Sequence, residues 1–139
     1  MEKRDYLMDQ IEQLGQALAL IFSKLYGLKS QGKVPEAIEM TNQSLKNELN
    51  LDIAELSAIA TDNFVLTLKE EKKFNYTNLE RLADILLLIA DDSEDNKTLN
   101  DQSLNLYAKC LCIYNYLNES DLTYSFERQS KIERISSMI

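Results

Sequence analysis

The sequence predicts a single all-α domain over residues 1–139, built from six to seven antiparallel helices arranged as stacked helical hairpins. Glycine and proline together supply only four residues, about a quarter of their average share, and the corners of β-sandwiches and barrels need those residues. Apolar residues recur every three or four positions in most segments. They make up 45% of the chain, and charged residues 27%, which excludes wholesale disorder and provides a core without metal or disulfide.

The first helix is expected over residues 5–31, with Asp5 as its N-cap. Its apolar residues alternate between spacings of four and three and form one seam along about six turns. The seam consists of Leu7, Ile11, Leu14, Leu18, Ile21, Leu25 and Leu28. The stripe is too wide and apolar for a free coiled coil, so we expect this helix to pack against two neighbours. Gly15 and Ala17 would allow a close helix crossing.

Turn and cap residues mark the next three helices. Gly32 ends the first helix, and Pro35 lies in the first turn of a second helix over residues 34–49. Its inward residues are expected to be Ala37, Ile38, Thr41, Leu45 and Leu49. Asp52 and Glu55 form a capping box for a short helix to about residue 60. Asp62 caps a further helix, which carries Phe64, Val65 and Leu68 and frays over residues 69–73.

Three more segments complete the predicted order. Thr77 and Glu80 form a second capping box, which opens a strongly buried helix carrying Leu79, Leu82, Ala83, Leu86, Ile89 and Ala90. Residues 91–100 are polar and predict a loop. A long helix over 101–117 is expected to place Leu104, Tyr107, Ala108, Leu111 and Tyr114 on one face. After a break at 118–120, a last helix begins near Thr123 with Phe126, Ile132 and Ile135 inward.

Charge and composition exclude several kinds of function. The net charge is −8, and residues 51–100, with 5 basic and 11 acidic groups, hold most of it. No basic stripe is present, so we expect no nucleic-acid binding. The acidic excess is either a solvated surface or a face for a cationic partner. The chain has no histidine, which excludes serine–histidine and cysteine–histidine nucleophiles and removes the commonest metal ligand.

The two cysteines indicate a reducing environment. Cys110 and Cys112 are two positions apart on a predicted helix, so their side chains point about 200° from each other. They can neither bond together nor share a metal. With no disulfide framework and no recognisable signal peptide, a cytoplasmic location is expected. The longest apolar run, residues 85–90, is too short to cross a membrane. No cofactor, metal or membrane is therefore expected.

Residues 18–49 resemble one unit of the tetratricopeptide repeat, in which two helices flank a glycine turn. The matching motifs are Gln31-Gly32-Lys33 at the turn, Glu36-Ala37-Ile38 at the start of the second helix, and the small–large pair Ser44-Leu45. The departures are Leu25, Thr41 and Leu49, the last in place of the closing proline. The resemblance implies stacked helical hairpins that present a protein-binding groove.

A second segment, residues 79–117, resembles the same unit, and residues 52–72 would be a degenerate middle one. The second-helix positions are taken by Ser103-Leu104, Tyr107 and Cys110-Leu111. The opening Asp5-Tyr6-Leu7-Met8, with Gln10-Ile11-Glu12, Gly15 and the later Leu106-Tyr107, also resembles a group of small bacterial all-helical proteins. That resemblance implies a fold and no assigned activity.

Two groups of polar residues could carry chemistry. Carboxylates between residues 91 and 101 invite a calcium loop, but Asn96 stands where such a loop needs glycine and Gln102 where it needs glutamate. A solvated loop explains them better. Tyr107 and Tyr114 lie seven apart on one helix face, with Tyr116 and Tyr124 nearby. They are either buried tyrosines with bonded hydroxyls or an exposed aromatic patch for a partner.

We therefore expect a non-enzymatic protein-interaction or scaffold module that uses a groove or face of its stacked hairpins to bind a protein or peptide, or a second copy of itself. The alternatives are an obligate homodimer with a structural role and, third, an enzyme that uses carboxylate and tyrosine residues. No catalytic or metal-ligating residue is predicted, and the sequence does not assign the binding residues.

Overall fold

The computed structural model describes residues 2–92, 101–120 and 125–139, and all of their regular structure is helical. The helices are α1 (Glu2–Ser30), α2 (Val34–Leu49), α3 (Ile53–Ala58), α4 (Thr61–Glu70), α5 (Tyr76–Asp92), α6 (Asp101–Ser120) and α7 (Phe126–Met138). The predicted all-α class and the order of its helices are confirmed.

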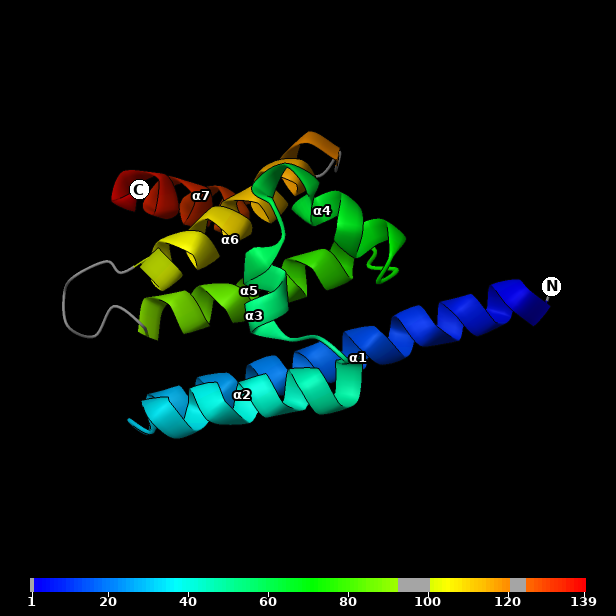
Figure 1. Cartoon of the computed structure of the whole chain (residues 1–139), viewed down its shortest axis with the longest axis horizontal. Helices are drawn as coiled ribbons and strands as arrows, with labels where there is room; N and C mark the ends of the chain where they lie inside the picture. The colour runs from blue at the N-terminus through cyan, green and yellow to red at the C-terminus, as the bar shows by residue number, and fades with distance from the viewer. Residues whose placement is uncertain (1, 93–100, 121–124) are drawn as a thin grey trace.

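The helices are arranged around α5 (Figure 1). α1 and α2 form an antiparallel hairpin, α5 packs on α1, and α6 packs on the other side of α5. α3, α4 and α7 all pack against α6. α1 and α5 run in the same direction, since the start of α5 contacts the first half of α1. There the Asn78 side-chain amide donates to the Ile11 carbonyl, with an N–O distance of 3.1 Å.

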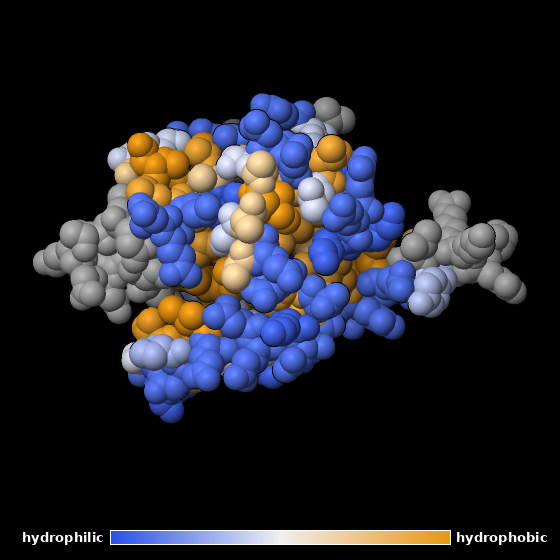
Figure 2. Space-filling model, in the orientation of Figure 1, coloured by the Kyte–Doolittle hydropathy of each residue, from blue (hydrophilic) through white to orange (hydrophobic). Residues whose placement is uncertain are grey.

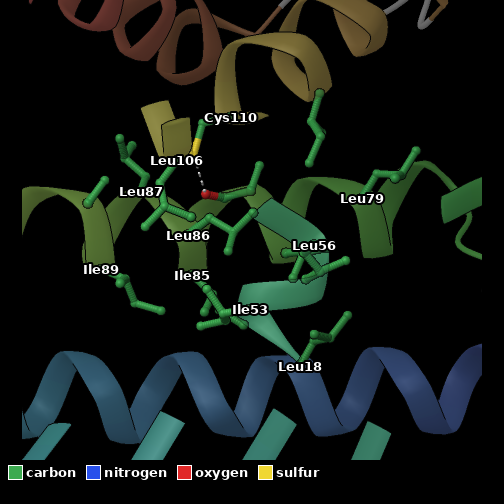
Figure 3. Packing of buried hydrophobic residues seen from close by; sticks show 14 of the residues in the cluster. Leu18, Ile53, Leu56, Leu79, Ile85, Leu86, Leu87, Ile89, Leu106 and Cys110 are labelled. Atoms are coloured by element: carbon green, nitrogen blue, oxygen red, sulfur yellow. Dashed lines mark hydrogen bonds between the residues drawn. The ribbon is translucent and has the colours of Figure 1, made fainter. Parts of the chain in front are cut away.

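Side chains from all seven helices build one apolar core. α5 contributes most to it, because both of its flanks are covered: its buried apolar residues are Leu79, Leu82, Ala83, Ile85, Leu86, Leu87, Ile89 and Ala90. Figure 3 shows Ile85 pointing towards α1, which carries Leu18, and Leu87 beside Leu106 of α6. The Cys110 thiol donates to the Ala83 carbonyl (3.4 Å) and so joins α6 to α5 within the core.

The predicted seam of α1 is fully buried only from Leu18 to Leu25. Leu18, Ile21 and Leu25 are fully buried, whereas Ile11, Leu14 and Leu28 are half-buried. Leu7 lies outside the side chains that the structure describes. The difference arises because α1 has 29 residues and α2 has 16, so that α1 is about 20 Å longer than its hairpin partner.

Gly15 lies where α1 crosses α5, and it leaves room for two side chains of α5. A Cβ atom there would lie 2.5 Å from Nη1 of Arg81 and 2.7 Å from Oδ1 of Asn78. Gly32 adopts a φ of +77°, as expected for the residue that ends a helix. Ala17 is half-buried and lies beside the end of α2 instead of in the crossing.

Four N-caps were predicted and one is confirmed. Asp5 is not a cap, because α1 begins at Glu2 and includes Asp5. Asp52 accepts from the Ala54 N–H at 2.8 Å and caps α3. The cap of α5 is not Thr77 but Asn75, whose Oδ1 accepts from the Asn78 N–H at 2.8 Å. Asp62 was also wrong, because α4 begins one residue earlier and its N-cap, Ala60, makes no side-chain cap bond.

The boundaries around the last two helices differ from the prediction. α6 continues through the predicted break to Ser120, and the Asn118 side chain accepts a hydrogen bond from Arg128 there. α5 includes Asp91, where the loop was expected to begin, and residues 93–100 lie outside the described part. α7 begins at Phe126 with Ser125 as its cap, while Thr123 is not described. Phe126 is 80% exposed, so its predicted inward position was wrong.

The buried face of α6 is rotated from the predicted one. Leu104, Ala108 and Leu111 are half-buried, and the fully covered apolar positions are Leu106, Tyr107, Cys110, Ile113, Tyr114 and Leu117. The rotation follows from packing, because α6 contacts α5, α7 and the α3–α4 segment and its core face is defined by α5.

Candidate functional site

A cleft of about 780 Å³ lies beside the first half of α1. Four side chains form its apolar lining: Ile11, Leu14, Ala17 and Leu49. The polar lining consists of four amides, two carboxylates and two lysines: Gln10, Gln13, Asn47, Asn50, Glu48, Glu71, Lys72 and Lys73. We call this the α1 cleft. Figure 2 shows hydrophobic side chains reaching the surface along the line where the α1–α2 hairpin meets the rest of the molecule.

The early end of α2 creates the α1 cleft. Asn50 adopts the left-handed conformation (φ 53°), which asparagine tolerates better than most residues. Its N–H reaches the Lys46 carbonyl at 3.1 Å, and the Leu51 N–H reaches the Leu45 carbonyl at 3.0 Å. The chain then turns away into α3. The space beside Ile11 and Leu14 that a longer α2 would cover therefore stays open.

The connection between α4 and α5 forms the opposite wall of the cleft. Phe74 is buried, and its N–H donates to the Leu68 carbonyl at 3.1 Å. Lys73, just before it, has a positive φ of 60°. Anchoring Phe74 in the core in this way leaves Lys72 and Lys73 lining the cleft.

Two smaller clefts lie nearby. One of about 530 Å³ runs along the other flank of α1 between Met8 and Arg81. Ile11 lines both this cleft and the α1 cleft, so the first half of α1 is open on two sides. The other, of about 550 Å³, lies between α2 and α3 and extends to Gln102. Its lining is mostly polar, with Ile53 and Ala54 as the apolar members.

A series of ion pairs joins α7 to α5. Three cations at every third position of α7 each meet a carboxylate of α5: Arg128 Nε with Glu80 Oε2 at 2.8 Å, Lys131 Nζ with Asp84 Oδ1 at 2.9 Å, and Arg134 Nη1 with Asp91 Oδ1 at 2.9 Å. Both arginine pairs are bidentate, because a second nitrogen of each donates to the other carboxylate oxygen at 3.1 Å. We call this arrangement the charge ladder.

Two tyrosines of α6 donate hydrogen bonds to carboxylates of the charge ladder. The Tyr114 hydroxyl donates to Asp84 at 2.5 Å, and the Tyr107 hydroxyl donates to Asp91 at 2.7 Å. Both side chains are fully buried, and burial is the main cause that raises the pKa of Tyr114. For these two residues the interpretation as buried, bonded tyrosines is confirmed and the exposed patch was wrong. Tyr124 lies outside the described residues.

The ladder does bring carboxylates and tyrosines together, as the enzyme alternative required. Each of its three carboxylates, however, is neutralised by a cation of α7. None of the ladder residues lines any of the three clefts. The arrangement therefore fits a contact that docks one helix on another better than it fits a substrate pocket.

Two further clusters were not found from the sequence. On the surface, Lys69 donates to the Tyr116 hydroxyl at 2.5 Å, which lowers the pKa of Tyr116, and the Tyr76 ring meets Tyr116 edge-on. In the interior, Lys109 is only 3% exposed and its ammonium lies 5.4 Å from the centre of the Phe64 ring. Desolvation by burial lowers the pKa of Lys109.

The described residues hold no group of three or more cysteines, aspartates or glutamates placed to bind a metal ion. Most of the candidate calcium loop lies in residues 93–100, outside the described ranges. Over the part of the chain that could be searched, no helix combines the length and apolarity needed to cross a membrane. Comparison with models of known families, with curated proteins and with solved structures finds no match for the chain.

Proposed function

We propose that this protein is an interaction module that binds an amphipathic helix of a partner protein in the α1 cleft. The observation that carries the proposal is the unmatched length of α1, which leaves Ile11 and Leu14 in an open cleft of about 780 Å³. A partner helix would lie along α1 where α2 stops, as a third helix in the same layer. Apolar anchors at helical spacing would then meet the apolar lining.

The polar lining of the cleft fits a helix that lies flat against it. Glu48 and Glu71 balance Lys72 and Lys73, so the cleft has no strong preference for a charged partner. Specificity would instead come from apolar shape and from amides that pair with polar side chains at the edge of the partner helix. Tetratricopeptide-like stacking of the hairpins is part of this proposal, since such stacks present grooves of this kind.

A homodimer is the second candidate, and exposed apolar residues on α1 favour it. Tyr6 is 64% and Met8 59% exposed, and both lie on the half of α1 that α2 does not cover. Two copies of α1 could cover these side chains mutually in a twofold contact. We further propose a reducing cytoplasm as the location, on the support of two free thiols, Cys110 and Cys112.

Selection from a displayed library of random peptides, with the full-length chain as bait, tests the proposed function. We expect the selected peptides to share apolar residues at spacings of three and four, and to bind the chain in a fluorescence anisotropy assay. Leu14→Glu places a charge in the cleft and should weaken their binding at least tenfold. Leu20→Glu is the matched control, because Leu20 is 52% exposed on the same helix and does not line the cleft.

Two results would contradict the helix-binding proposal. One is a set of selected peptides without helical spacing, and the other is equal binding by the Leu14 and Leu20 variants. Light scattering separates the homodimer candidate: a dimer that Leu14→Glu dissociates and Leu20→Glu preserves would make a second copy of the chain the occupant of the cleft.

A further inference from the structure

α7 combines few buried apolar side chains with a row of ion pairs. Among its apolar side chains only Ile135 is fully buried, Ile132 and Met138 are partly buried against the core, and Phe126 is 80% exposed. The charge ladder supplies the remaining attachment to α5. Its Lys131–Asp84 and Arg134–Asp91 pairs are accessible to water, since Lys131 is 31% and Arg134 45% exposed. Ion pairs of this kind weaken with salt.

The acceptor side of the ladder does not depend on α7. Asp84 and Asp91 each accept a hydrogen bond from a tyrosine of α6, and α5 and α6 pack extensively on each other. These hydroxyls hold the two carboxylates in place whether or not α7 is present. With α7 removed, the surface would be a row of three carboxylates, two of them held by tyrosines, beside the apolar side chains that Ile135 covers.

We propose that this face of α5 and α6 is a docking site for a basic amphipathic helix of a partner protein, and that α7 is its resident occupant. The partner helix would carry arginine or lysine at every third position, with an aliphatic residue next to the last of them, as α7 carries Arg128, Lys131, Arg134 and Ile135. The net charge of −8 would attract such a helix and increase its rate of association.

Exchange of one helix for the other is energetically feasible because it replaces like with like. Arg128 is 95% buried and pairs with Glu80, and removing a buried cation alone would leave its carboxylate unpaired. An incoming helix of the same pattern restores that pair. The inference concerns a different surface from the α1 cleft and does not rest on the function proposed for it.

The test uses the full chain and a fluorescein-labelled synthetic peptide that copies residues 125–139. In the variant Lys131→Gln/Arg134→Gln, the resident helix loses the two exposed pairs, and the site should open more often. The apparent affinity for the peptide rises with the fraction of open molecules, so we expect the variant to bind it about tenfold more tightly than the wild type. A peptide with glutamine in place of its three cations should not bind.

The matched control is Ser130→Glu/Ser136→Glu, which makes the same change in net charge on exposed positions of α7. It should bind the peptide like the wild type. Failure of the Lys131/Arg134 variant to bind, with the helical circular dichroism of its core intact, would overturn the proposal. So would a swapped dimer, shown by light scattering together with cross-linking of α7 to α5 of another copy, because the occupant would then be a second copy.

Hydrogen exchange on the wild type decides the matter if that variant does not fold. Amides of α7 should exchange faster than those of α5, and should exchange at least several-fold faster when salt is raised from about 0.05 to 0.5 M. Equal, salt-independent exchange in the two helices would mean that α7 leaves its site only when the whole chain unfolds, and the docking proposal would be wrong.

Discussion

Replacing the buried lysine Lys109 by methionine should stabilise this protein. The side chain is 97% buried, and its ammonium lies 5.4 Å from the centre of the Phe64 ring. No carboxylate from the described residues pairs with it. Methionine has a similar length and no charge, so Lys109→Met keeps the packing of the methylene groups and removes the partly desolvated ammonium.

The size of the effect follows from two opposing contributions. Replacing a buried ion pair by apolar residues of similar volume is neutral or stabilises by about 1–4 kcal/mol, and the same reasoning applies to a lone ammonium. Burial lowers the pKa of Lys109, the direction expected when the charge is destabilising. Loss of the cation–π contact costs about 0.5–2 kcal/mol. We expect a net gain of about 1 kcal/mol in the free energy of unfolding at pH 7, which raises Tm by roughly 3 °C in a chain of this length.

The pH dependence gives the prediction a second, independent test. At pH 7 the lysine is protonated in both states, and the full cost of burying its charge is present. As pH rises from the lowered folded-state pKa towards the ordinary value of 10.5, the folded state releases its proton first, and the wild type gains stability. The advantage of Lys109→Met should therefore shrink over this window and fall to zero or below beyond it.

Urea unfolding followed by circular dichroism at several pH values measures both effects. Lys24→Met is the control, because Lys24 is exposed and its replacement should change the free energy of unfolding by less than about 0.5 kcal/mol. A Lys109→Met variant less stable than the wild type at pH 7, or one whose advantage stays constant up to pH 10.5, would refute the reasoning.

Two other side chains carry predictions. Tyr114→Phe removes the hydroxyl that donates to Asp84 at 2.5 Å and should destabilise by about 2 kcal/mol, whereas Tyr26→Phe, at an exposed position, should leave urea unfolding unchanged; equal effects would show that the hydrogen bond is worth little. A disulfide reagent should modify Cys112 slowly and Cys110 only after unfolding, since burial raises the pKa of the Cys110 thiol well above its ordinary value; mass spectrometry of the modified native chain checks this, and early labelling of Cys110 would contradict it.

Periodicity predicted the helices of this chain well, because each helix buries a stripe whose spacing is local. Leu18, Ile21 and Leu25 are fully buried as expected. The same pattern failed at Ile11 and Leu14, which are only half-buried. Nothing in their own segment differs from the buried half; what differs is that α2 ends opposite them. An apolar stripe indicates which face can be buried, and the length of the neighbouring helix decides whether it is.

Caps were harder to predict because several polar residues compete for one helix end. Asn75 and Thr77 are both good N-cap residues, and the chain uses Asn75, so that α5 begins two residues earlier than a cap at Thr77 would allow. At the α6–α7 boundary, asparagine at position 118 suggested the end of a helix. Asn118 nevertheless lies within α6, and its side chain accepts a hydrogen bond from Arg128 of α7. That bond joins two helices, and only the packed structure reveals it.

The candidate surfaces depended even more on long-range pairing. The ladder joins residues 43 to 48 positions apart, so no local window contains both members of a pair. One signal was nevertheless present: Arg128, Lys131 and Arg134 recur at every third position and therefore share a helix face. Phe126, the first residue predicted to face inward in this helix, is exposed, whereas each of the three cations pairs with a carboxylate of α5.

The structure also changes the meaning of the acidic excess in residues 51–100. From the sequence, those carboxylates were either a solvated surface or a face for a cationic partner. Glu80, Asp84 and Asp91 do face a cationic partner, and that partner is α7 of the same chain. Since all three cations of α7 are used in this contact, the acidic face and the basic helix act as one complementary pair. Because the charges in this contact are partly exposed, another basic helix can take the place of α7 on α5. The contact of α5 with α1 is apolar, and a basic helix could not take the place of α1.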